Sequence, residues 1–168
     1  IRNLDTDGLM GEILPFMERP ASEGGLPDSV SRPIDQDYLR SLIPLVHERL
    51  KKLTEATDAL DFFFADNINP GAADLPGRKM DVEMTVNALN SALELCRTVS
   101  PFEPDHLEAE YRALAAEIEM KPGQLFSPIR VATTGKTFAP PLFDTMAAIG
   151  QARCVARIEN ALRILRSA

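Results

Sequence analysis

Apolar residues recur three and four positions apart along most of the chain, which is the spacing of an amphipathic helix. One stripe lies between residues 82 and 96, a second between 107 and 118, and a third between 155 and 165. No segment shows the apolar–polar alternation or the β-branched runs of a strand. The pattern therefore predicts an all-α fold built as a helical bundle.

Glycine and helix-capping residues predict where several shorter helices begin and end. A first helix is predicted from about Thr6 to Met17, with Asp5 or Thr6 as its N-cap. Near the carboxyl end, Gly135 is the predicted C-cap of one helix, and Gly150 stops the next.

The segment from Asn67 to Gly77 contains two Pro-Gly pairs, which break regular structure. We take it as the boundary between two small helical subdomains, residues 1–75 and 76–168, which together would form an α-helix cage. Because the chain begins with Ile1 and not with Met, we also expect it to be part of a longer protein.

The composition allows a substantial core, since 45% of the 168 residues are hydrophobic. The longest apolar runs, such as residues 60–65, fall far short of the roughly 20 residues that cross a bilayer, and no secretory signal is present. We therefore expect a cytoplasmic monomer that does not contact a membrane. Cys96 and Cys154 lie on apolar helix faces and are expected to be buried thiols.

The net charge of −7 argues against a nucleic-acid partner, but the charge is unevenly distributed. From Lys121 onward, seven basic residues stand against two acidic ones. A basic end on an acidic body suits a protein of which only one face meets phosphate. Solvated helix faces are the alternative interpretation of the same charges.

No catalytic or metal-binding residue is predicted. His47 and His106 have no metal-ligand partners nearby in the sequence, and no Gly-rich phosphate loop or Ser, His, Asp spacing occurs. The carboxylates of residues 108–119 are expected to form a solvated helix face. The chain is therefore expected to bind a partner and not to catalyse a reaction.

Several short motifs follow one another in an informative order. The segment 121–124 has the pattern K-x-G-Q, 128–135 has P-I-R-x-A-x-T-G, and 140–143 ends in Leu-Phe. Two earlier blocks, 45–55 with E-R-L-K-K-L and 61–64 with three phenylalanines, precede them. In this order the chain resembles the carboxyl-terminal, anticodon-binding region of bacterial glutamyl-tRNA synthetases.

The resemblance implies that the parent protein ligates glutamate to tRNA(Glu) and that this region binds the anticodon stem-loop. ATP and Mg²⁺ would act in the catalytic domain of the parent, whose His-Ile-Gly-His-like and Lys-Met-Ser-Lys-Ser-like elements are absent from this sequence. We therefore expect the 168-residue chain to carry no cofactor, to be inactive alone, and to have its own catalytic domain and tRNA(Glu) as partners.

Arg49 is the first candidate for reading the anticodon. In the resemblance it falls on the arginine that discriminating enzymes use against the third anticodon base. Cytosine offers acceptors on its pairing edge, whereas guanine offers N–H donors there, so a guanidinium, which only donates, favours cytosine. The alternative is a surface arginine paired with Glu48 or Asp58.

Arg130 is the second candidate, because the resemblance puts it in the anticodon pocket. The alternative is a half-buried arginine bonded to backbone carbonyls or to Asp144. Further possible contacts to the RNA backbone are Lys121, Gln124, Thr134 and Lys136.

Each of the weaker features has two interpretations, one as a binding feature and one as part of the structure. Arg153 and Arg157 could face phosphate from one helix, or form a solvated face. Phe62–Phe64 could stack on anticodon bases, or belong to the core. A free-standing helical adaptor that binds a protein is the first alternative for the whole chain, and a helical DNA-binding module is the second.

Overall fold

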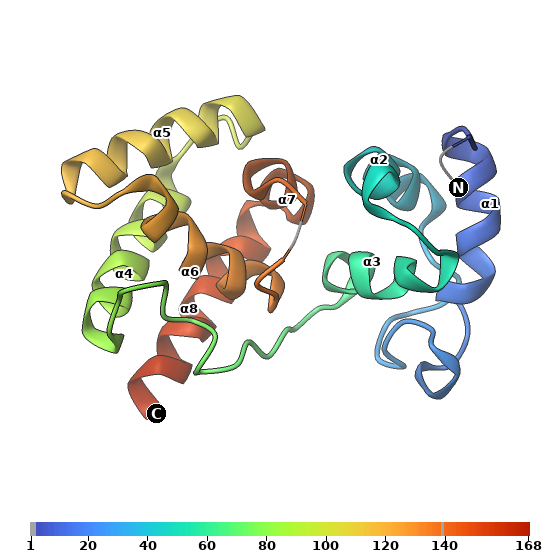
Figure 1. Ribbon diagram of the computed structural model, residues 1–168, viewed down its shortest axis with the longest axis horizontal. Helices are drawn as coiled ribbons and strands as arrows, with labels where there is room; N and C mark the ends of the chain where they lie inside the picture. The colour runs from blue at the N-terminus through green and yellow to red at the C-terminus, as the bar shows by residue number, and fades with distance from the viewer. Residues whose placement is uncertain (1–2, 139) are drawn as a thin grey trace. The chain divides into compact units, whose positions relative to one another are not determined.

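The computed structural model describes residues 3–138 and 140–168, and these residues form eight α-helices, three short 3₁₀ turns and no strand. The predicted all-α fold is therefore confirmed. The chain divides into two compact units, residues 1–66 and 67–168. Figure 1 shows the helices of each unit along the chain.

The first unit contains three α-helices and three 3₁₀ turns. Its elements are α1 (Thr6–Met17), η1 (Ala21–Glu23), α2 (Gln36–Val46), η2 (His47–Arg49), η3 (Leu53–Glu55) and α3 (Ala56–Phe64). Helix α1 packs against both α2 and α3. One face of α1 is closed off from solvent by this packing, and Leu9, Ile13 and Met17 are each 0% exposed.

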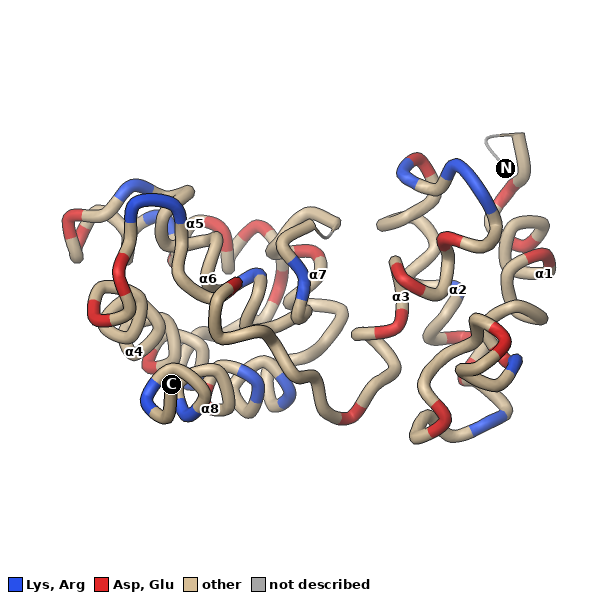
Figure 2. The backbone as a smooth tube through the Cα atoms, turned by 60° about the horizontal axis from the view of Figure 1, so that its bottom comes forward, with Lys and Arg blue, Asp and Glu red and all other residues tan. Residues whose placement is uncertain are grey.

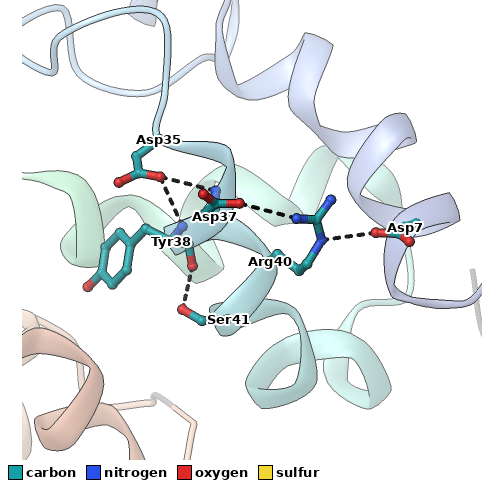
Figure 3. Close-up of polar contacts among 6 residues, drawn as sticks. All are labelled: Asp7, Asp35, Asp37, Tyr38, Arg40 and Ser41. Atoms are coloured by element: carbon teal, nitrogen blue, oxygen red, sulfur yellow. Dashed lines mark hydrogen bonds and ion pairs between the residues drawn. The ribbon is translucent and has the colours of Figure 1, made fainter.

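Carboxylates cap the first two helices. The side chain of Asp5 accepts a hydrogen bond from the Gly8 amide at 2.7 Å, which confirms one of the two predicted caps. Asp35 accepts from the amides of Asp37 and Tyr38 at 3.0 and 3.1 Å, as Figure 3 shows. Both helices therefore begin at acceptors that the local sequence supplies.

A single arginine organises the loop between α1 and α2. The Arg32 guanidinium donates five hydrogen bonds of 2.8–3.2 Å to backbone carbonyls. The acceptors are the carbonyl oxygens of Glu18, Arg19, Leu26, Pro27 and Val30. These bonds replace the regular hydrogen bonding that the loop lacks.

The second unit contains five α-helices. They are α4 (Val82–Thr98), α5 (Pro104–Glu117), α6 (Pro122–Thr134), α7 (Leu142–Ile149) and α8 (Gln151–Ser167). Helix α8 packs against α4, α6 and α7 and forms the centre of the unit. As predicted, Gly135 and Gly150 follow helix ends, with φ angles of 74° and 94° that favour glycine.

The segment that leads into α4 belongs to the second unit. The Ile68 carbonyl accepts a hydrogen bond from Asn160 on α8 at 3.3 Å, and Leu75 is fully buried. The predicted boundary lies between residues 75 and 76, whereas the structure divides the chain between Asp66 and Asn67. The Pro-Gly pairs lie in a loop packed on the second unit and do not mark a linker.

Both cysteines are buried and free, as predicted. Burial raises the pKa of the Cys96 thiol to about 11, and burial also raises the pKa of the Cys154 thiol. Both groups are therefore protonated at neutral pH and unsuited to nucleophilic chemistry. Among the described helices, none is both long enough and apolar enough to cross a bilayer.

Candidate nucleic-acid interface

Arg49 is held at the surface of the first unit by the two buried residues that flank its turn. It is the last residue of η2, directly after α2. Val46 and Leu50, only 1% and 2% exposed, anchor the turn, and the Leu50 amide donates to the Val46 carbonyl at 3.1 Å. The Arg49 side chain is exposed to solvent. Its role in reading RNA stays a prediction.

Two further cations lie between η2 and η3, directly after Leu50. Lys51 and Lys52 are both exposed, and their amides donate to the Glu55 carboxylate at 2.9 and 3.3 Å. These two bonds are the main reason that the pKa of Glu55 is lowered. The two lysines are not among the residues predicted from the sequence, although they follow Arg49 closely in it.

Arg130 is half-buried on α6, between residues that are in the core. Ile129 and Val131 on either side are 0% and 1% exposed, and α6 packs against α8. The arginine therefore sits at the edge of the packed face, where its side chain is partly accessible. Its role in binding RNA stays a prediction.

Thr134 shapes the turn after α6. It is only 2% exposed, and its hydroxyl donates to the Arg130 carbonyl at 2.7 Å and accepts from the Lys136 amide at 3.1 Å. The Thr134 hydroxyl therefore makes its hydrogen bonds within the protein. Lys136, in the same turn, is half-exposed.

Lys121 and Gln124 come together at the start of α6, where they line a pocket of about 410 Å³. The other lining residues are Arg78, Lys79, Gly123 and Ser127. Sequence analysis missed Arg78 and Lys79. They are two adjacent cations immediately after a Pro-Gly pair, but nothing local to them indicates that the fold brings them to α6.

The structure buries three of the residues in the weaker interpretations. Arg157 does not face solvent: it is 3% exposed, and its Nη1 donates to the Thr133 carbonyl at 2.7 Å. Phe62 and Phe63 are 2% and 0% exposed and belong to the core, so they cannot stack on a base. In contrast, Phe138 is 90% exposed in the turn after α6, outside any periodic stripe.

The chemistry of these surfaces suits an anion. The candidate residues on these surfaces carry guanidinium, ammonium and amide donors, and such groups bind phosphate and the acceptor edges of bases. Within residues 3–138 and 140–168, no group of three or more His, Cys, Asp or Glu side chains is placed to hold a metal ion.

Comparison with known proteins gives one consistent result. Residues 9–162 match the family described as "Anticodon binding domain". The glutamate–tRNA ligase of Roseiflexus castenholzii is 45% identical over 168 residues, which is 100% of this chain and 32% of that protein. The enzyme of the same name from Chloroflexus aurantiacus is 43% identical over 99% of this chain and 33% of its own length. The chain thus spans about a third of the length of these relatives.

Solved structures share the fold. The glutamate tRNA ligase of Elizabethkingia meningosepticum superposes with a TM-score of 0.73 over 95% of this chain and 29% of that chain, at 17% identity. The glutamate–tRNA synthetase of Elizabethkingia anophelis gives 0.70 over 96% of this chain and 29% of its own length, also at 17% identity. The helical arrangement is therefore one that is found in solved proteins.

Proposed function

Since the chain belongs to the anticodon binding domain family, we propose that it is the tRNA-reading part of a glutamate–tRNA ligase and binds the anticodon stem-loop of tRNA(Glu). The observation that supports this most strongly is the 45% identity to a glutamate–tRNA ligase along the whole chain. In this proposal, ATP, Mg²⁺ and glutamate act in a separate catalytic domain. The chain alone binds tRNA as a monomer and forms no aminoacyl product.

Arg49 reads the third anticodon base in this proposal. It lies on a turn anchored by buried residues on both sides, so its backbone is fixed while the residue remains exposed to solvent. The guanidinium donates to the acceptors of cytosine and is repelled by the donors of guanine. A contact of this kind contributes about 1 to 3 kcal/mol of discrimination, or roughly 5- to 150-fold.

Arg130 and Lys136 support the RNA from the second unit in this proposal. They flank the end of α6, and the Thr134 hydroxyl fixes the turn between them. Both side chains are half-exposed. A cation in such a place contributes to affinity through phosphate or base contacts without needing to move the backbone.

The test is fluorescence anisotropy with two anticodon stem-loops that differ only by cytosine or guanine at the third anticodon position, at low salt. We expect the wild-type chain to prefer cytosine and Arg49→Gln to lose that preference. The matched control is Arg40→Gln, which removes the same charge from the same unit. Arg40 lies on α2 and pairs with Asp7 and Asp37 at 3.0 and 3.3 Å, as Figure 3 shows.

Each other outcome has a clear meaning. If Arg49→Gln keeps the full preference, another residue reads the base. If the wild-type chain binds both loops equally, the chain only holds RNA without reading it. If it binds neither, the proposed function fails, and the acidic net charge of −7 makes a protein-binding adaptor the better explanation.

A further inference from the structure

The pocket of about 410 Å³ at the start of α6 has the composition of an anion site. It forms where the loop that leads into α4 meets the first turn of α6. Figure 2 shows the blue stretches of these two segments close together. Three of its six lining residues are cations: Arg78, Lys79 and Lys121.

These three charges are not neutralised by ion pairs. In the part of the chain that the structure describes, none of them forms a salt bridge, whereas Arg97 is paired with Glu94 and Glu159, and Arg112 with Glu108. All three side chains are exposed. Like charges gathered at one cavity repel each other, so an anion bound there would relieve the repulsion.

Two acceptors in these segments each accept a hydrogen bond from the backbone. The Asp81 carboxylate accepts from the Met84 amide at 2.8 Å and caps α4. The Gln124 side-chain oxygen accepts from the Lys121 amide at 3.4 Å, so the rest of its amide group offers N–H donors. Ser127 adds a hydroxyl to the lining. The pocket therefore presents mainly donors, which matches the two charged, non-bridging oxygens of a backbone phosphodiester.

We propose that this pocket holds one phosphodiester group of the bound RNA backbone, an inference that rests on the proposed function. Backbone phosphates carry no sequence information, so the pocket positions the RNA while Arg49 reads it. The consequence is a division of roles between the two units, with base reading in the first and backbone holding at this pocket in the second.

The test uses the same two stem-loops and the double variant Arg78→Gln, Lys79→Gln. Binding should weaken roughly tenfold for both loops alike, because a charge-assisted contact to phosphate is lost. The slope of log K against log salt should become less steep by about 1. The cytosine preference should stay unchanged.

A matched double variant controls for net charge. Arg163→Gln, Arg166→Gln removes two positive charges from exposed positions of α8 in the same unit. In the structure these residues are bonded to Asn160 and Asn90 and do not line the pocket. We expect this control to bind both stem-loops with an affinity and a salt slope close to those of the wild-type chain.

A second variant tests the pocket without removing a cation. Gly123 lines the pocket, and a Cβ added there meets no atom within 4 Å. Gly123→Glu puts a carboxylate in the first turn of α6, where negative charge favours the helix, so the fold is retained while phosphate is repelled. Gly11→Glu is its control, because Gly11 on α1 is equally open. Only Gly123→Glu should weaken RNA binding by tenfold or more.

Two results would overturn the inference while leaving the proposed function intact. One is equal weakening by the pocket variants and their controls, which would mean that only overall charge matters. The other is a change in the cytosine preference when Arg78 and Lys79 are replaced, which would mean that the pocket reads a base. If the wild-type chain binds neither stem-loop, the proposed function fails first, and the inference fails with it.

Discussion

The hydrogen bonds of Arg32 predict a large and specific effect on stability. This residue donates five bonds to backbone carbonyls of the loop between α1 and α2. Replacing it by alanine removes all five donors at once and leaves the carbonyls to water. Arg32→Lys keeps the charge, but its three donors share one nitrogen and cannot reproduce the planar fork.

The expected loss follows from the geometry of the bonds. A hydrogen bond to a charged group contributes about 1.5–3 kcal/mol when it is buried. Arg32 is half-buried, and its bond to the Arg19 carbonyl is exposed, so water compensates for much of the loss. We therefore expect Arg32→Ala to cost about 3 kcal/mol and Arg32→Lys about 2 kcal/mol. This is a large share of the roughly 3 to 10 kcal/mol expected for a unit of 66 residues.

The two tyrosines allow the first unit to be followed separately. The sequence contains only two, Tyr38 on α2 in the first unit and Tyr111 on α5 in the second. Fluorotyrosine labelling therefore gives one ¹⁹F signal for each unit during urea unfolding. With a slope near 1 kcal/mol per molar urea for so small a unit, Arg32→Ala should lower the midpoint of the Tyr38 signal by about 2 to 3 M.

Arg40→Ala is the matched control for this experiment. Arg40 is also an arginine of the first unit, but its side chain is 50% exposed and its partners are surface carboxylates. Such pairs contribute about 0–1 kcal/mol. If Arg32→Ala lowers the midpoint no more than Arg40→Ala does, the five bonds do not stabilise the loop and the reasoning is refuted.

Three further predictions concern the backbone and the thiols. At Gly25 an added Cβ would lie 1.8 Å from the Arg19 carbonyl oxygen, so Gly25→Ala should destabilise the first unit by at least about 2 kcal/mol in urea unfolding. Gly11→Ala, on an open helix face, should instead stabilise the unit by about 0.5–1 kcal/mol. Equal effects of the two substitutions would contradict the predicted clash at Gly25. Glu119 has a φ of 56° just after α5, a left-handed conformation that favours glycine. Glu119→Gly should therefore stabilise the second unit by about 1 kcal/mol and raise its melting temperature by a few degrees. A lower melting temperature would show that the Glu119 side chain makes stabilising contacts that outweigh the backbone strain. Burial raises the pKa of Cys96 from 9.0 to about 11, so between these pH values the unfolded chain has lost a proton that the folded chain keeps. The free energy of unfolding should therefore fall as the pH rises through this window. The fall should be smaller in Cys96→Ala, and identical pH profiles of the two proteins would rule out this contribution.

Local features were predictable from the sequence because their causes are local. The cap at Asp5 and the glycines at 135 and 150 depend on a few neighbouring residues and on the conformational freedom of glycine. The helical stripes of the second unit follow from spacing alone. The position of Arg157 could also have been found this way, since it lies three residues after the buried Cys154 and four before the buried Ala161.

Features that depend on tertiary packing were not predictable in the same way. The predicted unit boundary lies too late in the chain because Pro-Gly pairs indicate a break in regular structure, but not which unit the broken segment packs against. Leu75 is fully buried within that segment, and no local pattern distinguishes it from a linker residue. The pocket was missed for the same reason, since Arg78 and Lys79 lie more than 40 residues from Lys121 in the chain.

The acidic composition does not contradict an RNA-binding role, because RNA responds to the charge near the contact and not to the net charge of the chain. At physiological ionic strength the screening length is about 8 Å, so carboxylates farther away than this have little effect on a phosphate at the pocket. Near α6 the structure gathers three cations that form no salt bridge in the described residues. Remote acidic residues would instead weaken loose, nonspecific binding to nucleic acids in general, which depends on long-range attraction. An acidic chain with a concentrated basic site is therefore expected to bind RNA only where the geometry fits, and adding salt should weaken its specific binding less steeply than that of a uniformly basic domain.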